Sequence, residues 1–428
     1  MKVKYIYSAC MEIECSGFRI LTDPWFTDGA YDGTWYQFPK ISPFDFINKP
    51  DLIYISHIHP DHYDAKFLKE LISKFGDIPI LIPDLSPNYL LFKGKSDGLN
   101  LKPTNHFKNE KVEIFIEVND TGSASDIDSA LVVKDLQTEH VLLNLNDCIY
   151  NQLHVNKLQN IIDGLSKNID LLALGYTGAG NYPQTYIDHE MDRDLLVSEA
   201  YKKKITFFDR YKKYCKVFKS SYHLPFAGEY VLGGKLHHLN EYRGVADAYE
   251  VKEFDEKAIV LHSGGYVDLA NDEIFHQRDY LYPKQDLETR LESIKDNLFD
   301  YEREIKVPLE KINFMRLLKQ ASKKASEKSE LKNEYHFIIA ITDKSGEIRQ
   351  RFDLNTQDDI IKQLDLDIKI EHSAYSEIKI DYRYLYGLLT SLYHWNNGKV
   401  GSHYFTTRHP LENYNRKAYQ YLNFLVTC

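Results

Sequence analysis

Three histidines and one aspartate fall within six positions of this chain. They are His57, His59, Asp61 and His62, in the stretch Ser-His-Ile-His-Pro-Asp-His. Imidazole and carboxylate groups are the usual protein ligands of zinc and other first-row transition metals. Surface histidines that satisfy local hydrogen bonds are the alternative, but the pattern H-x-H-x-D-H favours a metal site. Two pairs of ligands on one turn can serve two adjacent ions.

Local elements predict how these four side chains are brought together. The apolar run Leu52–Ser56 predicts a strand, and an extended backbone points residues two apart, such as the first two histidines, to the same side. Pro60 then ends the strand. The aspartate and the last histidine fall on the turn that opens a helix predicted over Asp64–Phe75.

Two further aspartates follow predicted strands. Asp147 comes after the apolar run Val141–Leu145, and a carboxylate at such a strand end can bridge two cations. A turn-forming aspartate is the commoner case for an isolated residue, but beside the upstream cluster we favour the ligand. Asp23, in the stretch Leu-Thr-Asp-Pro-Trp, either orients a ligating histidine or forms an Asp-Pro turn. Both interpretations of Asp23 stay open.

Completing a second coordination sphere would require more histidines. His223 lies near a strand end, and His262 ends an apolar strand before Ser-Gly-Gly. Taken singly, each such residue is more often a hydrogen-bonded structural histidine than a ligand. The candidates by residue type are His106, His223, His237, His238 and His262.

Length and composition predict two parts. A chain of 428 residues exceeds one ordinary domain, and 43% hydrophobic with 27% charged residues is typical of a globular protein in water. From about Gln285 the composition shifts to a charged, helix-favouring stretch, in which Lys319–Lys332 is expected to be an exposed helix or linker. We therefore predict a catalytic domain over residues 1–284. Residues 285–428 would form a helical linker and a C-terminal α/β region, a candidate for substrate binding.

The order of elements predicts an α+β fold. Short strands alternate with helices in the first ~270 residues, which favours two sheets packed face to face under outer helices. The predicted strands there are Val3–Tyr7, Arg19–Thr22, Leu52–Ser56, Ile78–Ile82, Val112–Val118, Ala130–Val133, Val141–Leu145, Leu171–Leu174, Tyr222–Phe226 and Ala258–His262, and the helices are Asp64–Phe75, Val155–Leu165 and Met191–Phe218. Later come strands at Tyr335–Ile341, Glu347–Phe352, Ile368–His372 and Glu377–Ile380, a helix at Tyr382–Leu392 and a turn at Trp395–Gly398.

Charge and cysteine usage limit the partners and the compartment. A net charge of −10 argues against non-specific nucleic-acid binding. The run Lys202–Lys219, with eight basic residues against one aspartate, is interpreted as the solvated face of a helix. Five cysteines without a C-x-x-C pair suit a reducing cytoplasm. Because no apolar run reaches membrane-spanning length and the first residues are too polar for a signal peptide, we expect a cytoplasmic protein without a membrane or nucleic-acid partner.

Several stretches beyond the cluster carry a family resemblance. The chain resembles the metallo-β-lactamase superfamily and, more narrowly, the catalytic region of the CMP-N-acetylneuraminate hydroxylases. The supporting stretches are Ser8–Cys10, Thr22–Trp25, Asp51–His62, Asn146–Cys148, Gly178–Pro183 and Pro225–Gly228, with weaker echoes at Val400–Ser402 and Arg408–Pro410.

This resemblance implies a four-layer αββα sandwich with the metal site at one edge, here followed by a C-terminal mixed α/β extension. It also implies hydroxylation of an N-acetyl to an N-glycolyl group on a nucleotide-linked sialic acid, with O₂ and external electrons. The implied metal ligands are His57, His59, Asp61, His62 and Asp147, of which Asp61 and Asp147 are the candidate catalytic residues. The residues implied around the substrate are Gly178, Gly180, Tyr182, Phe226, Gly228 and Arg408.

Two departures from the family pattern matter. The hydroxylases carry an N-terminal Rieske iron–sulfur domain, whereas this chain begins at the lactamase-type strand and its cysteines form no such pattern, so we expect a separate redox partner protein. The stretch Thr121–Asp128 lacks the histidine that superfamily members often place there, and Phe226 lies about where many hydrolases have their last histidine. The site is therefore carboxylate-rich, incomplete, or finished by another residue such as Asp128.

Three functions remain open at this stage. The favoured one is an iron-dependent monooxygenase acting on a nucleotide-linked or glycan acylamino sugar, with two metal ions and an external electron donor. The second is a zinc- or manganese-dependent hydrolase of a phosphoester, amide or lactone. The third is a non-catalytic sugar-binding protein with a residual metal site. The oligomeric state is left open.

Overall fold

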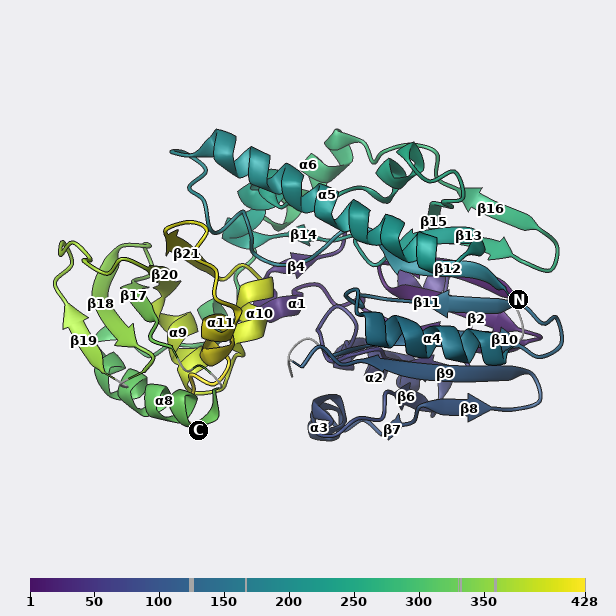
Figure 1. The fold of residues 1–428 in the computed structure, drawn as a ribbon, viewed down its shortest axis with the longest axis horizontal. Helices are drawn as coiled ribbons and strands as arrows, with labels where there is room; N and C mark the ends of the chain where they lie inside the picture. The colour runs from purple at the N-terminus through teal and green to yellow at the C-terminus, as the bar shows by residue number, and fades with distance from the viewer. Residues whose placement is uncertain (123–126, 166–167, 330, 332, 358–359, 428) are drawn as a thin grey trace.

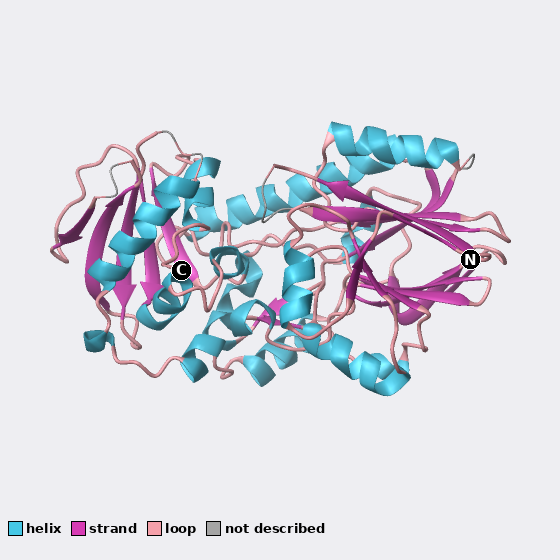
Figure 2. Ribbon diagram, turned by 90° about the horizontal axis from the view of Figure 1, so that it is seen from below, coloured by secondary structure: helices cyan, strands magenta, loops and turns pink. Residues whose placement is uncertain are grey.

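The computed structural model of the chain describes residues 1–122, 127–165, 168–329, 331, 333–357 and 360–427. The described residues form two lobes (Figure 1). The N-terminal lobe contains two large sheets that face each other between outer helices, and the C-terminal lobe contains a separate five-stranded sheet. Figure 2 shows the two facing sheets of the N-terminal lobe nearly edge-on.

The two sheets of the N-terminal lobe combine antiparallel and parallel strands. The first has the spatial order β16 (Glu273–Gln277), β15 (Leu261–Asp268), β1 (Lys2–Tyr7), β2 (Cys10–Cys15), β3 (Phe18–Thr22), β5 (Leu52–Tyr54), β6 (Ile80–Ile82) and β7 (Leu101–Pro103). The second has the order β13 (Ser220–Phe226), β12 (Ile169–Gly175), β11 (Val141–Asn144), β10 (Asp128–Asp135), β9 (Val112–Asn119) and β8 (His106–Lys108).

Side-chain alternation decides what each strand of the second sheet buries. Successive residues of a strand point to opposite faces. In β10, Leu131 and Val133 enter the core between the sheets, whereas Ala130 and Val132 pack under the outer helices. All four side chains are fully buried. A strand covered on both faces must be apolar throughout, which explains the continuous apolar runs of the central strands.

Helices cover the outer face of each sheet. The first sheet is covered by α2 (Ala65–Phe75) and α3 (Tyr89–Ser96), the second by α4 (Gln152–Gly164) and α5 (Arg193–Val217). Helix α2 begins where the sequence predicts, because the Asp64 side chain accepts a hydrogen bond of 3.0 Å from the Phe67 amide. The predicted four-layer αββα sandwich is confirmed.

The C-terminal lobe consists of one sheet and its helices. The sheet order is β19 (Ile361–Leu364), β18 (Ile348–Asn355), β17 (His336–Thr342), β20 (Tyr375–Asp381) and β21 (Tyr404–His409). Helices α8 (Phe314–Lys328), α9 (Tyr382–Leu389), α10 (Trp395–Val400) and α11 (Arg416–Leu422) belong to this lobe, and α6 (Lys284–Ile294) and α7 (Asp300–Glu304) precede it. The mixed α/β extension is therefore present.

Short elements join the two lobes. These are α1 (Ala30–Gly33) and the two-stranded sheet of β4 (Trp35–Tyr36) and β14 (Val231–Leu232). One apolar core runs from Phe67 under the first sheet to Ile339 in the C-terminal sheet. The Tyr384 hydroxyl donates a hydrogen bond of 2.7 Å to the Asp32 carboxylate across the same junction. The boundary near residue 285 remains a proposal, because this core is continuous across it.

Four predicted elements differ from the structure. Residues 368–372 are not a strand, since β18 pairs instead with β19, and the strand expected at 258–262 begins at Leu261 as β15. The expected turn at Trp395 is helix α10, which the His394 side chain caps by accepting from the Asn396 amide. Of the exposed helix or linker expected at Lys319–Lys332, the helix is present as far as Lys328, because Phe314–Lys328 form α8. Its apolar face is buried, and residues 330 and 332 lie outside the described residues.

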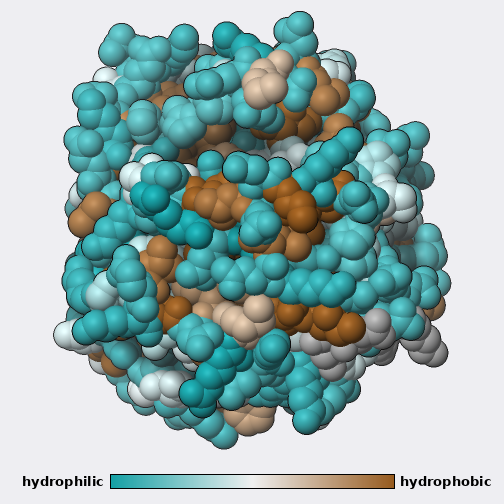
Figure 3. All heavy atoms as spheres, turned by 90° about the vertical axis from the view of Figure 1, so that its left-hand side faces the viewer, coloured by the Kyte–Doolittle hydropathy of each residue, from teal (hydrophilic) through white to brown (hydrophobic). Residues whose placement is uncertain are grey.

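Figure 3 shows the face of the molecule formed by the C-terminal lobe, where hydrophobic groups lie between hydrophilic ones. Among the described residues, no helix combines the length and apolarity needed to cross a membrane.

The core between the two sheets predicts a stability test. Leu171 in β12 is fully buried there, whereas Leu153 in α4 is 73% exposed. We expect Leu171→Ala to lower the free energy of unfolding by about 2–5 kcal/mol, because it leaves a cavity in close-packed surroundings. Urea unfolding followed by circular dichroism measures this. The matched control Leu153→Ala should change it by less than about 0.5 kcal/mol, and equal effects would contradict the assigned core.

Candidate metal centre and adjoining cavity

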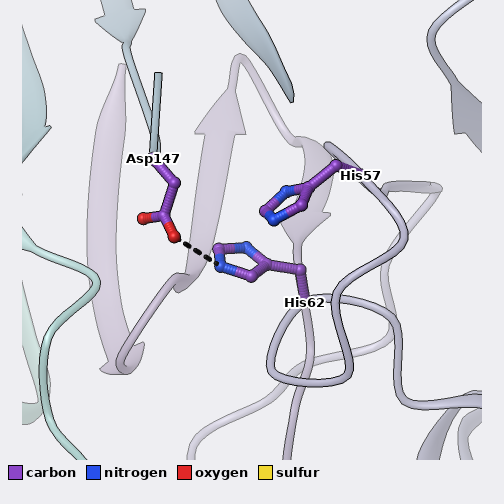
Figure 4. A group of neighbouring side chains, drawn as sticks. All are labelled: His57, His62 and Asp147. Carbon is purple, nitrogen blue, oxygen red and sulfur yellow. Dashed lines mark ion pairs between the residues drawn. The ribbon is translucent and has the colours of Figure 1, made fainter. Parts of the chain in front are cut away.

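The predicted ligands meet where strands of the two facing sheets end. The loop that carries the histidines follows β5, and Asp147 follows β11. Figure 4 shows His57, His62 and Asp147 pointing toward one another. The Nε2 atom of His62 lies 3.4 Å from Asp147 Oδ2 and 3.5 Å from Asp61 Oδ2. The fold thus joins the downstream carboxylate to the upstream cluster.

A second pair of donor atoms faces each other beside this group. His57 Nε2 and His59 Nδ1 are 2.8 Å apart, as expected for residues two apart on an extended backbone. The rings of His57 and His62 have centroids 4.1 Å apart. Two buried imidazole nitrogens in contact, next to two carboxylates, form a donor set that suits divalent transition metals. The residues present therefore fit the metal that the sequence predicts.

Asp128 contacts the Nδ1 atom of His57, whereas the other ring nitrogen of His57 faces His59. Its Oδ1 atom is 3.2 Å from His57 Nδ1, which also contacts the Ser56 hydroxyl at 2.9 Å. Because His57 Nε2 faces His59, Asp128 is placed to orient the ring by holding its other nitrogen. The predicted alternative in which Asp128 finishes the coordination sphere does not match this position. Residues 123–126, part of the stretch examined for a missing histidine, lie outside the described residues.

Asp23 has an equivalent position behind His62. Its Oδ2 atom is 3.3 Å from His62 Nδ1 and accepts a hydrogen bond of 3.1 Å from the Asn146 side chain, while Oδ1 accepts one of 2.8 Å from the Ser56 amide. The carboxylate is completely buried. Of the two interpretations left open, the geometry agrees with the orienting role.

Two contacts of the cluster were not anticipated from the sequence. The Tyr31 hydroxyl donates a hydrogen bond of 2.5 Å to Asp61 Oδ1. The side-chain amide of Asn396, from α10 of the C-terminal lobe, lies 3.0 Å from His59 Nε2. Neither residue belongs to a local motif, so no signal in the sequence could have identified it. The C-terminal lobe thus reaches the candidate metal centre directly.

Mutual charge effects set the protonation of the cluster. Burial disfavours a charged His62, but Asp61 and Asp147 outweigh it and raise the pKa of His62 well above its usual value. Burial alone would raise the pKa values of both carboxylates, yet the neighbouring His62 lowers them. Burial and His57 lower the pKa of His59 to about 4. Burial disfavours a charged His57 as well, but Asp128 outweighs it and raises the pKa of His57. Both shifts favour the protonated histidines, so protons compete with a cation for this cluster.

The other candidate histidines lie elsewhere. His106 is exposed and pairs with Glu113 at 3.1 Å. His223 pairs with Asp255 at 2.7 Å, and His262 stacks on His276 with ring centroids 4.6 Å apart. His237 and His238 lie in a short helical segment, where His237 contacts the Gly234 carbonyl. Among the described residues none of these five histidines joins the cluster of His57, His59, Asp61, His62 and Asp147.

A cavity of about 790 Å³ adjoins the cluster at His59, Asp61 and Asp147. Residues of both lobes line it. Of the six residues predicted around the substrate, five line this cavity: Gly178, Gly180, Tyr182, Gly228 and Arg408. Phe226 is the exception. It is 1% exposed and packs with Leu224 in the core between the sheets, and Ala227 faces the cavity instead.

Two glycines of the cavity wall are required by close packing. A Cβ atom at Gly178 would lie 1.7 Å from the Phe207 ring, and one at Gly228 would lie 2.5 Å from the Thr177 side chain. Glycine therefore lets these two loops approach their neighbours. Because both glycines line the cavity, this close packing helps to set the shape of the cavity.

Basic residues line one side of the cavity. Lys203 and Arg210 come from α5, and Lys399 and Arg408 from the C-terminal lobe. The solvated face expected for Lys202–Lys219 is present, since most of its basic residues are exposed, but Lys203 and Arg210 lie on the side of α5 that lines the cavity. Burial lowers the pKa of Lys203 to about 7, and its Nζ atom donates a hydrogen bond of 2.9 Å to the Tyr182 carbonyl.

The Tyr31 contact predicts a loss of metal affinity. Tyr31→Phe removes the hydroxyl that fixes Asp61 and keeps the ring, so we expect metal binding to weaken by about 10–100-fold with unchanged folding. Competition with a chromogenic chelator measures the affinity. Tyr63→Phe is the control, because the Tyr63 hydroxyl donates to Asp97 outside the cluster. Equal affinities for the two variants would contradict the assignment.

The protonation of His62 predicts the pH dependence of metal binding. Because its pKa is raised, His62 keeps its proton through neutral pH, and a metal must displace that proton. We expect affinity to fall by about tenfold per pH unit for each displaced proton as the pH is lowered from 8 to 6. Calorimetry in buffers of different ionisation enthalpy counts the protons released. An affinity that does not change with pH would contradict the proposed exchange of proton and metal.

Comparison with known proteins agrees with this architecture. Residues 2–154 match the beta-lactamase superfamily domain. The cytidine monophosphate-N-acetylneuraminic acid hydroxylase of Danio rerio is 31% identical over 150 residues, which are 34% of this chain and 25% of that protein. A protein of Mycobacterium tuberculosis provisionally named as a Rieske 2Fe-2S iron-sulfur protein is 28% identical over 253 residues, 56% of this chain and 46% of that protein.

A solved structure is similar in part. A metallo hydrolase from the archaeon Ignicoccus hospitalis superposes with a TM-score of 0.39 and 14% sequence identity, covering 62% of this chain and 97% of that one. The segments matched in the two sequence relatives cover only 25% and 46% of those proteins. Residues 2–154, which carry the loop of three histidines and Asp147, therefore match the beta-lactamase superfamily domain and are similar to part of the CMP-N-acetylneuraminic acid hydroxylases.

Proposed function

We propose that this protein is an iron-dependent monooxygenase that hydroxylates a nucleotide-linked or glycan acylamino sugar. One observation carries the proposal: a cluster of three histidines and two aspartates opens into a cavity of about 790 Å³ with basic and aromatic walls. A cavity of this size suits a ligand of the dimensions of a sugar nucleotide. The sequence similarity to a hydroxylase of such a substrate supports the choice of reaction.

The proposed metal ligands are His57, His59, Asp61, His62 and Asp147. The donor atoms of His57, His62 and Asp147 lie within 4.8 Å of one another. Bound iron would supply the capacity to activate O₂, which no side chain has. Asp147 follows the strand of the opposite sheet, and its side chain is 37% exposed, so it faces both the other ligands and the cavity.

The surrounding residues hold the ligands in place. Asp128 and Asp23 contact the outer nitrogens of His57 and His62, and each fixes the orientation of its ring. Tyr31 fixes Asp61, and Asn396 holds His59 from the other lobe. Because neighbouring side chains hold the proposed ligands, the position of the metal would stay constant while the substrate enters and leaves.

The basic wall would bind the anionic part of the substrate. The Arg408 guanidinium lies over the rings of Tyr182 and Tyr186, with distances of 5.2 and 4.9 Å to their centroids, and its Nε atom is buried without a hydrogen-bond partner. The guanidinium of Arg210 lies 4.5 Å over the Phe207 ring. Guanidinium groups bind carboxylates and phosphates, and the rings pack against sugar or base. Residues 285–428 would thus contribute directly to substrate binding.

Electrons would come from a separate redox protein. The similarity to a protein named for a Rieske cluster supports an iron–sulfur donor. The described cysteines are all free thiols: Cys10 and Cys15 are the two ends of β2, Cys148 follows β11 and Cys215 lies in α5. The iron–sulfur electron donor and the sugar substrate are both part of the proposal.

A metal-dependent hydrolase is the alternative, since the same ligands suit zinc or manganese. The distinction depends on the source of the oxygen atom in the product. A hydrolase takes it from water and works without O₂. A monooxygenase takes it from O₂ and consumes two electrons.

Isotope labelling tests the proposed reaction. The iron-loaded protein is incubated with ¹⁸O₂, a chemical or ferredoxin-type reductant and a panel of nucleotide-linked acylamino sugars, and products are analysed by mass spectrometry. We expect one substrate to gain a single ¹⁸O atom. We expect His57→Ala to reduce the yield by at least about 100-fold, because it removes a ligand, and the control His106→Ala to leave it unchanged. Turnover under anaerobic conditions, with oxygen from water, would instead identify a hydrolase.

A further inference from the structure

A second group of metal-ligating side chains lies in the C-terminal lobe. It consists of His336 at the start of β17, Asp353 in β18 and His372 in the segment between β19 and β20. Figure 1 shows β17 and β18 in the left-hand lobe, whereas β11, which precedes Asp147, is in the other lobe. This group is therefore separate from the candidate metal centre at His57, His62 and Asp147, and the two do not share an ion.

Strand pairing brings these residues together. Strands β17 and β18 are antiparallel, and Asp353 pairs with Ile338, two residues after His336. Residues two apart share a face of the sheet, so His336 and Asp353 are diagonal neighbours. The third residue is brought close by Arg351, whose guanidinium donates hydrogen bonds of 3.0 and 3.1 Å to the carbonyls of Leu366 and Ile368.

The donor atoms are arranged around one point. His336 Nδ1 lies 2.8 Å from Asp353 Oδ1, and His372 Nε2 lies 2.8 Å from Asp353 Oδ2. The two rings are stacked, with centroids 3.5 Å apart and planes inclined by 23°. One donor atom from each residue lies within 4.8 Å of the others. Ligands about 2.1 Å from one ion lie roughly 3 Å apart, so small side-chain shifts would make these three atoms a coordination face.

We propose that His336, Asp353 and His372 bind a divalent transition-metal ion, Zn²⁺ in the first instance, at a site separate from the catalytic cluster. Two imidazoles and one carboxylate are ligands for zinc and its first-row neighbours, whereas Mg²⁺ and Ca²⁺ prefer oxygen donors. The side chains of His336 and Asp353 are 14% and 10% exposed, and that of His372 is 34% exposed. The site is thus held by the sheet on one side and open to ions from solution on the other.

Nearby contacts agree with a metal site. The Nε2 atom of His336, on the far side of its ring, lies 3.3 Å from Glu334, which can hold the tautomer that leaves Nδ1 free to bind. A simple hydrogen-bonded triad is the competing interpretation, with one proton in each His–Asp contact. Bound metal would replace both protons and tie the loop before β20 to the two strands.

Calorimetric titration of the full chain with Zn²⁺ tests this inference. Metal-free protein is prepared with a chelator. We expect wild type to bind one more Zn²⁺ per chain than the variant His336→Ala/His372→Ala. The matched control His106→Ala/His140→Ala removes two histidines that belong to neither group and should bind as many ions as wild type. The variant His57→Ala/His62→Ala should retain the additional ion. Equal stoichiometry for wild type and the His336/His372 variant would overturn the proposal.

A second measurement uses wild type alone and does not depend on how the variants fold. Diethyl pyrocarbonate modifies accessible imidazoles, and peptide mass spectrometry quantifies each site. We expect saturating Zn²⁺ to reduce modification of His336 and His372 by at least about fivefold, with His106 unaffected. Unchanged modification of His336 and His372 at saturation would also overturn the proposal.

Discussion

Burial of charge at one sheet edge is the constraint on which the rest of this structure depends. Asp61, His62 and Asp147 lie within a few ångströms of one another at the junction of two sheets, and an uncompensated charge there would be costly. Compensation comes from opposite charge inside the cluster and from hydrogen bonds around it. The raised pKa of His62 and the lowered pKa values of the two carboxylates are consequences of the same packing.

The supporting contacts come from three separate segments of the N-terminal part of the chain. Asp23 leaves β3, Asp128 begins β10, and Tyr31 belongs to the short segment that joins the lobes. Each of these three residues contacts a different proposed ligand. The metal centre therefore forms only when the sandwich and the joining segment are both folded. The carboxylates of Asp128 and Asp23 contact the Nδ1 atoms of His57 and His62, which leaves the Nε2 atoms of these two rings available to a cation.

The C-terminal lobe has two roles in this arrangement. It closes the cavity with Lys399 and Arg408, and through Asn396 it reaches His59. The continuous apolar core between the lobes fixes the positions of these residues relative to the N-terminal lobe. The cavity therefore belongs to neither lobe alone, and its basic wall combines one side of α5 with residues almost 200 positions further along the chain.

The local features of this protein follow from its sequence: the H-x-H-x-D-H turn, the strand before it, the helix after it and the αββα order of elements. Strand alternation, capping by Asp64 and the two-residue spacing of His57 and His59 depend on neighbours in the chain, so the sequence predicts them. Packing between distant segments places Phe226 in the core, turns Lys203 inward and brings Asn396 to His59. Those outcomes depend on which surfaces pack together, and contacts between residues distant in sequence leave no periodic signal in a single chain.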